Sequence, residues 1–140
     1  PVHNLSNSLM NESDLLIMNE TELATLSGDS LSRQFTSQGL NKSLEKIPLT
    51  NKQSVIVTLG SQGVYVYENK TGTLISGLDM ATVDTTGSGD CFVGALATQY
   101  LVHGNLVDAA YFANKAAALS VTKKGASASM PSLEEVVNLI

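Results

Sequence analysis

Two short, continuous apolar runs stand out in the first half of the chain, at residues 14–18 and 54–59. Uninterrupted runs of this length are typical of strands that are buried on both faces. The second run is followed by a glycine turn and then by β-branched and aromatic residues at 64–67 and 73–75. This pattern predicts an antiparallel hairpin at one edge of a sheet.

Helical patterns separate and follow these strands. A short helix is predicted after the first strand, ending at Gly28 as a glycine C-cap. One irregular helical region follows and ends before Pro48, although it is rich in Ser, Thr and Asn. Longer apolar patterns predict helices over about 91–101 and over 106–121, the second rich in alanine and suited to close packing. Ser132 is predicted to cap a last helix.

The alternation of buried strands with helices predicts an α/β domain. The sheet is expected to be largely parallel. In such sheets ligands bind at the carboxyl ends of the strands. We therefore expect the polar, glycine-containing turns that follow the strands to gather at one edge.

One of these turns carries most of the candidate chemistry. It reads Asp-Thr-Thr-Gly-Ser-Gly-Asp over residues 84–90, between a segment with strand character that ends near Val83 and the helix predicted from about Cys91. Glycines allow the backbone to approach a bound group closely. The N–H groups at the start of a helix favour anions, phosphates above all. Asp90 is a poor phosphate ligand beside such a site, so we expect it to handle a proton.

Composition and charge exclude several classes of function. The chain has 140 residues, a net charge of −5 and only eight scattered Lys and Arg residues, which argues against a nucleic-acid surface. The apolar runs are too short to span a membrane, and no signal peptide opens the chain. The single cysteine excludes an internal disulfide and a thiolate metal cluster. We interpret Cys91 as a packed small side chain rather than a reactive thiol.

Four separated motifs then occur in a recognisable order. They are Asn19–Glu22, Thr58–Gly63, Asp84–Gly94 and the end segment Ala116–Pro131. With these motifs the chain resembles the ribokinase (PfkB-type) family of carbohydrate and nucleoside kinases, over nearly all of its length. The resemblance implies a ribokinase-like α/β fold with three layers, a mostly parallel sheet and helices on both faces, here incomplete. It also implies transfer of the ATP γ-phosphoryl group to a sugar hydroxyl, with D-ribose as the expected acceptor and ribose 5-phosphate as the product.

The resemblance also implies roles within the 84–90 turn. Asp90 is similar to the general base that takes the proton from the acceptor hydroxyl. Gly87, Ser88 and Gly89, with the Asp90 amide, are similar to the anion hole that neutralises the moving phosphoryl group. Ser88 replaces the commoner alanine, which still leaves a small residue with a usable amide.

Three ligand sites are implied outside that core. Asn19 and Glu22 match an element that organises magnesium and phosphate largely through water, although a helix N-cap explains the same residues. The nucleotide is expected at Thr58, Leu59, Gly60, Ser61, Gln62 and Gly63, together with Gly89, Asp90 and Asn114. By itself the 58–63 segment is a β-turn, and Asn114 is a solvent-facing or helix-packing residue.

A monovalent cation, usually potassium, is the third implied ligand. Its expected positions, mostly main-chain carbonyls, are Asp84, Thr86, Ser120, Lys123, Gly125 and Ser129. Potassium is large and weakly hydrated, so carbonyl oxygens and one carboxylate suit it. The alternatives are a turn-capping acid for Asp84 and a simple surface connection for the loop.

Family members are about twice this length, so we expect this chain to be a carboxy-terminal half over residues 1–140, without the sugar-binding half and the lid. Alternatives left open are a non-catalytic nucleotide-binding fragment and a relative that acts on another sugar or nucleoside. The isolated fragment is expected to be inactive. The default compartment is the cytoplasm, and a homodimer of the full-length protein through the lid is left open.

Overall fold

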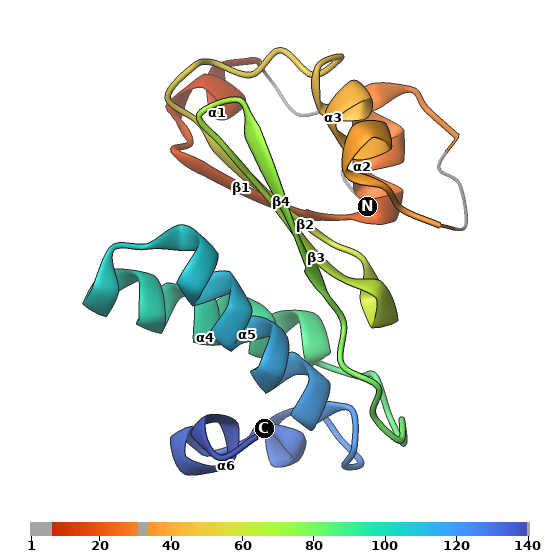
Figure 1. Ribbon diagram of the computed structural model, residues 1–140, viewed down its shortest axis with the longest axis vertical. Coiled ribbons are helices and arrows are strands. Elements are labelled where there is room, and N and C mark those ends of the chain that lie inside the picture. The colour runs from red at the N-terminus through yellow and green to blue at the C-terminus, as the bar shows by residue number, and fades with distance from the viewer. Residues whose placement is uncertain (1–6, 31–33, 140) are drawn as a thin grey trace. The chain divides into compact units, whose positions relative to one another are not determined.

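The computed structural model describes residues 7–30 and 34–139 (Figure 1). The chain divides into two compact units, residues 1–75 and residues 76–140.

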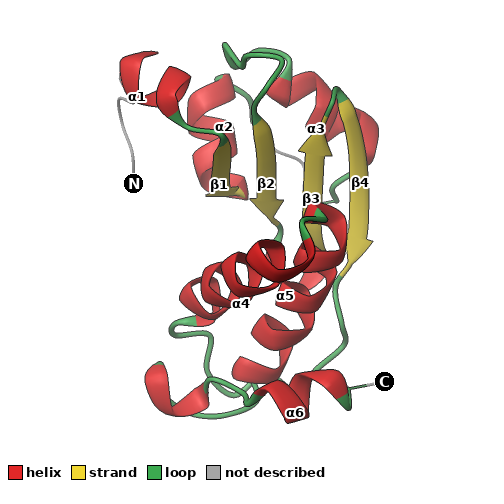
Figure 2. Ribbon diagram, turned by 90° about the vertical axis from the view of Figure 1, so that its left-hand side faces the viewer, coloured by secondary structure: helices red, strands yellow, loops and turns green. Residues whose placement is uncertain are grey.

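The first unit is built around a sheet of four strands. Its elements are α1 (Asn7–Glu12), β1 (Leu15–Asn19), α2 (Glu20–Ser27), α3 (Ser37–Leu44), β2 (Ser54–Thr58), a 3-10 turn (Gly60–Gln62), β3 (Gly63–Glu68) and β4 (Thr71–Ser76). The strands lie in the order β1-β2-β3-β4 (Figure 2). β1 and β2 are parallel, whereas β2 and β3 are antiparallel. The predicted α/β class and the predicted hairpin are confirmed, and the described sheet is mixed.

One face of this sheet packs against the helices of the same unit. Strand side chains alternate between faces, so Met18, Val57 and Tyr65 point to the same side in neighbouring strands. Leu23 of α2 and Leu40 of α3 join them in one buried cluster. Gly28 ends α2 in the left-handed conformation (φ 70°), as the sequence predicted.

Tyr65 makes Gly72 an obligatory glycine. The Tyr65 ring is 0 % exposed, and its hydroxyl lies 2.6 Å from Oδ1 of Asn41 on α3. A Cβ built on Gly72 would lie 1.6 Å from that hydroxyl oxygen. The ring cannot swing away without losing both its burial and its hydrogen bond. Tyr65 therefore crosses β4 directly over the bare backbone of Gly72.

We expect Gly72→Ala to lower the free energy of unfolding by about 3 kcal/mol, because overpacked cores must shift side chains or backbone. Urea denaturation measures the change. In a Tyr65→Leu background the same substitution should cost much less, because the overlapping hydroxyl is gone. Equal costs in both backgrounds would show that the overlap with Tyr65 is not the cause.

The second unit consists of helices and loops in the part of the chain that the structure describes. Its helices are α4 (Ser88–His103), α5 (Leu106–Ser120), a 3-10 turn (Ser127–Ser129) and α6 (Leu133–Val137). α4 and α5 form a helical hairpin whose link is Gly104, in the left-handed conformation, and Asn105, the N-cap of α5. Ala109, Ala110 and Ala113 are buried, so the prediction of close packing through small residues is confirmed.

Two predicted boundaries in this unit are wrong. The segment up to Val83 was predicted to have strand character, but residues 77–83 form neither strand nor helix. The N–H groups of Val83 and Asp84 both donate to the Val121 carbonyl, at 2.7 and 3.1 Å, instead of pairing with a strand. α4 begins at Ser88 rather than near Cys91, because Gly87 already serves as its N-cap.

Ser132 caps α6 as predicted, and it does so in a capping box. Its hydroxyl accepts the Glu135 N–H at 3.2 Å, and the Glu135 carboxylate accepts the Ser132 N–H at 2.7 Å. Within residues 7–30 and 34–139, no helix is long and apolar enough to cross a membrane.

Candidate active site

The 84–90 turn leads directly into the first turn of α4. Gly87 adopts a left-handed conformation (φ 78°) that favours glycine. The Ser88 N–H donates to the Thr85 carbonyl at 3.2 Å, and the Cys91 N–H donates to the Gly87 carbonyl at 2.9 Å. These two bonds close the turn and begin the helix.

Three amides remain available at this point. Among the described residues, no acceptor is found for the N–H of Gly87, Gly89 or Asp90. The first N–H groups of a helix have no partner inside the helix and lie at the positive end of its dipole. α4 has 16 residues, so this end can bind an anion. Within the predicted anion hole, the Ser88 amide is instead used to close the turn.

Asp90 lies in the first turn of α4, and its side chain is exposed. Gly89, beside it, has no heavy atom within 4 Å of the position of a Cβ. The fold itself therefore has room for a side chain at position 89. A carboxylate and two unpaired N–H groups thus lie within two consecutive residues.

Asp84 joins this turn to a loop 41 residues further along the chain. Its Oδ1 accepts the Thr86 N–H at 3.0 Å and the Thr86 hydroxyl at 2.7 Å, and its Oδ2 accepts the Gly125 N–H at 2.9 Å. These hydrogen bonds, that from Gly125 first, hold the pKa of the Asp84 carboxyl below its ordinary value. Asp84 is a turn-capping acid in this structure, as the alternative interpretation had it.

This pKa shift predicts how the contact depends on pH. Because the folded pKa is lowered, the carboxylate stabilises the fold above the unfolded pKa of about 3.9, and this contribution is lost as pH falls through the folded pKa. We expect the Gly125 amide resonance to titrate with a midpoint below that value. An NMR titration measures it, with Asp84→Asn as the control that removes the titration. A midpoint at or above 3.9 would contradict the assignment.

The other predicted cation residues lie on α5 and on the loop after it. The Ser120 hydroxyl donates to the Ala117 carbonyl at 2.8 Å. The buried Ser129 hydroxyl donates to the Ala126 carbonyl at 2.7 Å. The Lys123 ammonium pairs with Glu135 at 2.7 Å.

The donor set of this region fits a large monovalent cation. Among the described residues, no donor faces the carbonyl oxygens of Asp84, Thr86, Lys123 or Gly125. No group of three or more His, Cys, Asp or Glu side chains gathers anywhere in the described chain. Neutral carbonyls with one nearby carboxylate suit a weakly charged, weakly hydrated ion better than a divalent transition metal.

In the first unit, Asn19 and Glu22 form a capping box. The Asn19 Oδ1 accepts the Glu22 N–H, and the Glu22 Oε2 accepts the Asn19 N–H, both at 2.9 Å. The N-cap interpretation of these residues is therefore confirmed. The second carboxylate oxygen can still accept from a metal-bound water, so a water-mediated magnesium role fits the geometry.

Thr58 lies directly across from Asn19 in the parallel register of β2 and β1. Both strands end at these residues, so the predicted gathering of polar turns at the carboxyl ends is confirmed for this pair. The turn after β2 has left-handed glycines at Gly60 (φ 56°) and Gly63 (φ 104°). The Leu59 N–H donates to the Gly63 carbonyl at 2.9 Å.

The side chains of Leu59, Ser61 and Gln62 in this turn differ in burial and in hydrogen bonding. Leu59 is buried in the core, so only its backbone faces the turn. Gln62 accepts the Phe35 N–H at 3.3 Å through Oε1. Ser61 is exposed.

Asn114 is a packing residue in this structure. Its side-chain amide donates to the Ser76 carbonyl at 2.9 Å, and the residue is 8 % exposed. None of the hydrogen bonds described for it reaches the 84–90 turn. Cys91 is likewise packed, as predicted, with Ala116 and Val136, and burial raises the pKa of its thiol.

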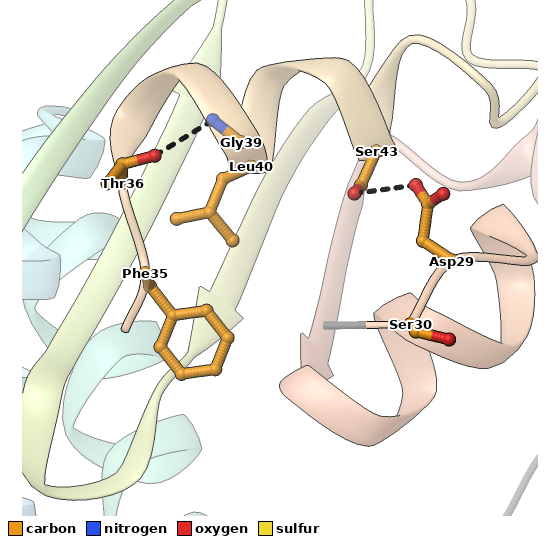
Figure 3. A pocket seen from close by; sticks show the side chains of 7 residues that line it. All are labelled: Asp29, Ser30, Phe35, Thr36, Gly39, Leu40 and Ser43. Carbon is orange, nitrogen blue, oxygen red and sulfur yellow. Dashed lines mark hydrogen bonds between the residues drawn. The ribbon is translucent and has the colours of Figure 1, made fainter. Parts of the chain in front are cut away.

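A cavity of about 190 Å³ lies beside α3 (Figure 3). Figure 3 shows two hydrogen bonds beside it. The Thr36 hydroxyl oxygen accepts the Gly39 N–H at 3.1 Å, and the Ser43 hydroxyl donates to the Asp29 carboxylate at 2.8 Å. Asp29 also pairs with Lys46. No predicted site residue lines the cavity, whose lining residues are Asp29, Ser30, Phe35, Thr36, Gly39, Leu40 and Ser43.

Sequence reasoning missed Ala126. It lies against the Gly87 turn, and a Cβ built on Gly87 would come within 3.0 Å of the Ala126 Cβ. Nothing in the spacing of the sequence signals a contact between these two positions, which are 39 residues apart.

Comparisons with known proteins match this geometry to one family. The model of the pfkB family carbohydrate kinase matches residues 3–133. The ribokinase of Staphylococcus aureus is 36% identical over 137 residues, which are 97% of this chain and 44% of the relative. Fructokinase-1 of Zea mays is 33% identical, over 95% of this chain and 41% of the relative.

Solved structures of ribokinases and fructokinases are similar to this chain as well. An Arabidopsis thaliana ribokinase, complexed with ribose and ATP, superposes with a TM-score of 0.83 and 33% identity, over 96% of this chain and 43% of that one. A Vibrio cholerae fructokinase, bound to fructose, ADP and a calcium ion, gives a TM-score of 0.72 and 30% identity over 89% of this chain and 40% of that one. The chain thus spans less than half the length of these four relatives.

Proposed function

Because this chain belongs to the pfkB family of carbohydrate kinases, we propose that the whole protein transfers the ATP γ-phosphoryl group to a sugar hydroxyl. We propose D-ribose as the acceptor and ribose 5-phosphate as the product. The observation that carries the proposal is the start of α4, where the unpaired N–H groups of Gly89 and Asp90 adjoin the Asp90 carboxylate.

Asp90 is proposed as the general base. Its exposed carboxylate accepts the proton of the sugar hydroxyl as that oxygen attacks the γ-phosphorus and the bond to the ADP oxygen breaks. A positioned base of this kind is worth about 10²- to 10⁴-fold in rate. The Gly87–Gly89 turn with the Asp90 amide is proposed as the anion hole, which stabilises the charge on the transferring group without reorganisation.

The nucleotide is proposed to contact the 58–63 turn, where left-handed glycines leave the backbone open, and Asn114. Asn19 and Glu22 are proposed to orient magnesium through its bound waters. Magnesium, when bound, neutralises phosphate charge. Potassium is proposed to bind at Asp84, Thr86, Ser120, Lys123, Gly125 and Ser129. This is supported by the carbonyl oxygens of Asp84, Thr86, Lys123 and Gly125, which lack donors in the described chain.

The choice of ribose rests on the relatives. Ribokinases of Staphylococcus aureus and Haemophilus influenzae are 36% and 33% identical to this chain, and maize fructokinase-1 is 33% identical. We further propose that the chain is the carboxy-terminal, nucleotide-binding and catalytic part of the protein.

A substrate panel on the full-length protein tests this proposal. D-ribose, D-fructose and adenosine are each offered with ATP and magnesium, with and without potassium, and ADP formation is followed. We expect the highest kcat/KM for D-ribose and activation by potassium. Activity on fructose or adenosine but not on ribose would overturn the assignment of D-ribose as the acceptor. A rate that does not change with potassium would overturn the proposed cation site.

A further inference from the structure

We propose that Ala126 is a positioning residue for the phosphoryl-transfer site. By lying against Gly87 it fixes the turn that aims the Gly89 and Asp90 N–H groups. This inference rests on the proposed function, because it concerns the same site. It assigns a role to a side chain that is neither a proposed ligand nor the proposed base.

The contact itself is close and specific. The three heavy atoms nearest to a Cβ built on Gly87 all belong to Ala126, with its Cβ at 3.0 Å and its Cα at 3.1 Å. The Gly87 backbone therefore lies against Ala126 with no room between them for one more methyl group. Any displacement of residue 126 toward the turn must move Gly87.

Ala126 is in turn held from both sides. On one side, the Asp84 carboxylate accepts the N–H of the preceding residue, Gly125, at 2.9 Å. On the other, the Ser129 hydroxyl, only 1 % exposed, donates to the Ala126 carbonyl at 2.7 Å. The Ser129 N–H also donates to that carbonyl, at 3.2 Å. The backbone around residue 126 is thus held by Asp84, at the start of the same turn, and by Ser129 within the loop.

The supported turn determines where the Gly89 and Asp90 amides point. Gly87 is the N-cap of α4, and its carbonyl accepts the Cys91 N–H. Gly89 and Asp90 lie between these two residues, so a shift of Gly87 reorients their N–H groups. Transition-state stabilisation depends on donors that are preorganised to within fractions of an ångström, and a misplacement of about 1 Å can cost about 10²-fold in rate.

The role is separable from folding because Ala126 is otherwise exposed. A larger side chain there fills no core, and the contact it disturbs is the one with the turn. Ala128 is the matched control. It lies in the same loop, is also exposed, and is not among the atoms nearest to Gly87.

The experiment compares Ala126→Val with Ala128→Val in the full-length protein. We expect Ala126→Val to lower kcat by about 10- to 100-fold, with KM for ATP and the thermal midpoint within error of the parent. Ala128→Val should retain the parental kcat. In NMR spectra the Gly89 and Asp90 amide resonances should shift in Ala126→Val and stay in place in Ala128→Val.

Several outcomes would overturn the proposal. Parental kcat in Ala126→Val would do so, as would equal losses in the two variants. If Ala126→Val does not fold, Ala126→Gly and Ala126→Ser replace it, and parental kcat in both counts against the role. A parent protein without kinase activity would refute the proposed function instead, and the amide shifts would then still decide whether Ala126 positions the turn.

Discussion

Replacing Asp90 by Asn in the full-length protein is expected to lower kcat by about 10²- to 10⁴-fold. The amide is nearly the same size as the carboxylate but cannot accept the proton of the sugar hydroxyl. The anion-binding amides belong to the backbone and remain in place. Binding of ATP with magnesium, measured by calorimetry, should therefore change little.

Asp108 offers a matched control for this substitution. It too is an exposed aspartate in the first turn of a helix, α5. Asp108→Asn removes the same favourable interaction with a helix dipole without touching the proposed base. Any loss of stability should be similar in the two variants, and only Asp90→Asn should lose turnover. Normal turnover in Asp90→Asn would refute the assignment of the base.

The second large effect is expected at Gly89. Its Cβ position is open, with no heavy atom within 4 Å, and its φ is not positive. Gly89→Ala should therefore fold as well as the parent, since alanine is the better helix former by up to about 1 kcal/mol. The added methyl group would however stand beside the free amides, so we expect kcat to fall by about 10²-fold, similar to the loss of one donor.

Two neighbouring glycines separate the effects on folding and on catalysis. Gly94→Ala adds a methyl group to open space in the same helix, so its effect on the thermal midpoint should have the same sign as that of Gly89→Ala. Gly87→Ala places a side chain in a left-handed conformation against Ala126 and should cost at least about 1–2 kcal/mol. Full activity in Gly89→Ala would show that no ligand approaches position 89.

Much of the local structure could be predicted from the sequence because its causes are local. Gly28 ends α2 and Ser132 begins α6 through contacts within a few residues. Both strands, β1 and β2, were readable from their continuous apolar runs. Burial on both faces is found for β2 but not for β1, in which Met18 alone is buried. That Asn19 and Thr58 lie at one edge of the sheet followed from the rule that parallel strands end at the same edge, whereas their direct register did not.

What the sequence could not predict depends on partners far along the chain. Val83 does not continue a strand because the Val121 carbonyl binds its N–H. Gly87 lies against Ala126, a contact that spans 39 residues. The resemblance placed Asp84 and Gly125 at one cation site, but it did not indicate the hydrogen bond from the Gly125 N–H to the Asp84 carboxylate. The start of α4 was placed three residues late because a left-handed N-cap glycine is not distinguishable from a loop glycine in a single sequence.

The most direct test of this account is ³¹P NMR of the full-length protein with ATP, magnesium, potassium and D-ribose. We predict that a sugar phosphomonoester signal grows in step with ADP, and that Asp90→Asn abolishes both. Release of inorganic phosphate without a sugar phosphate, or an Asp90→Asn variant that forms the ester at the parental rate, would contradict a sugar kinase whose base is Asp90.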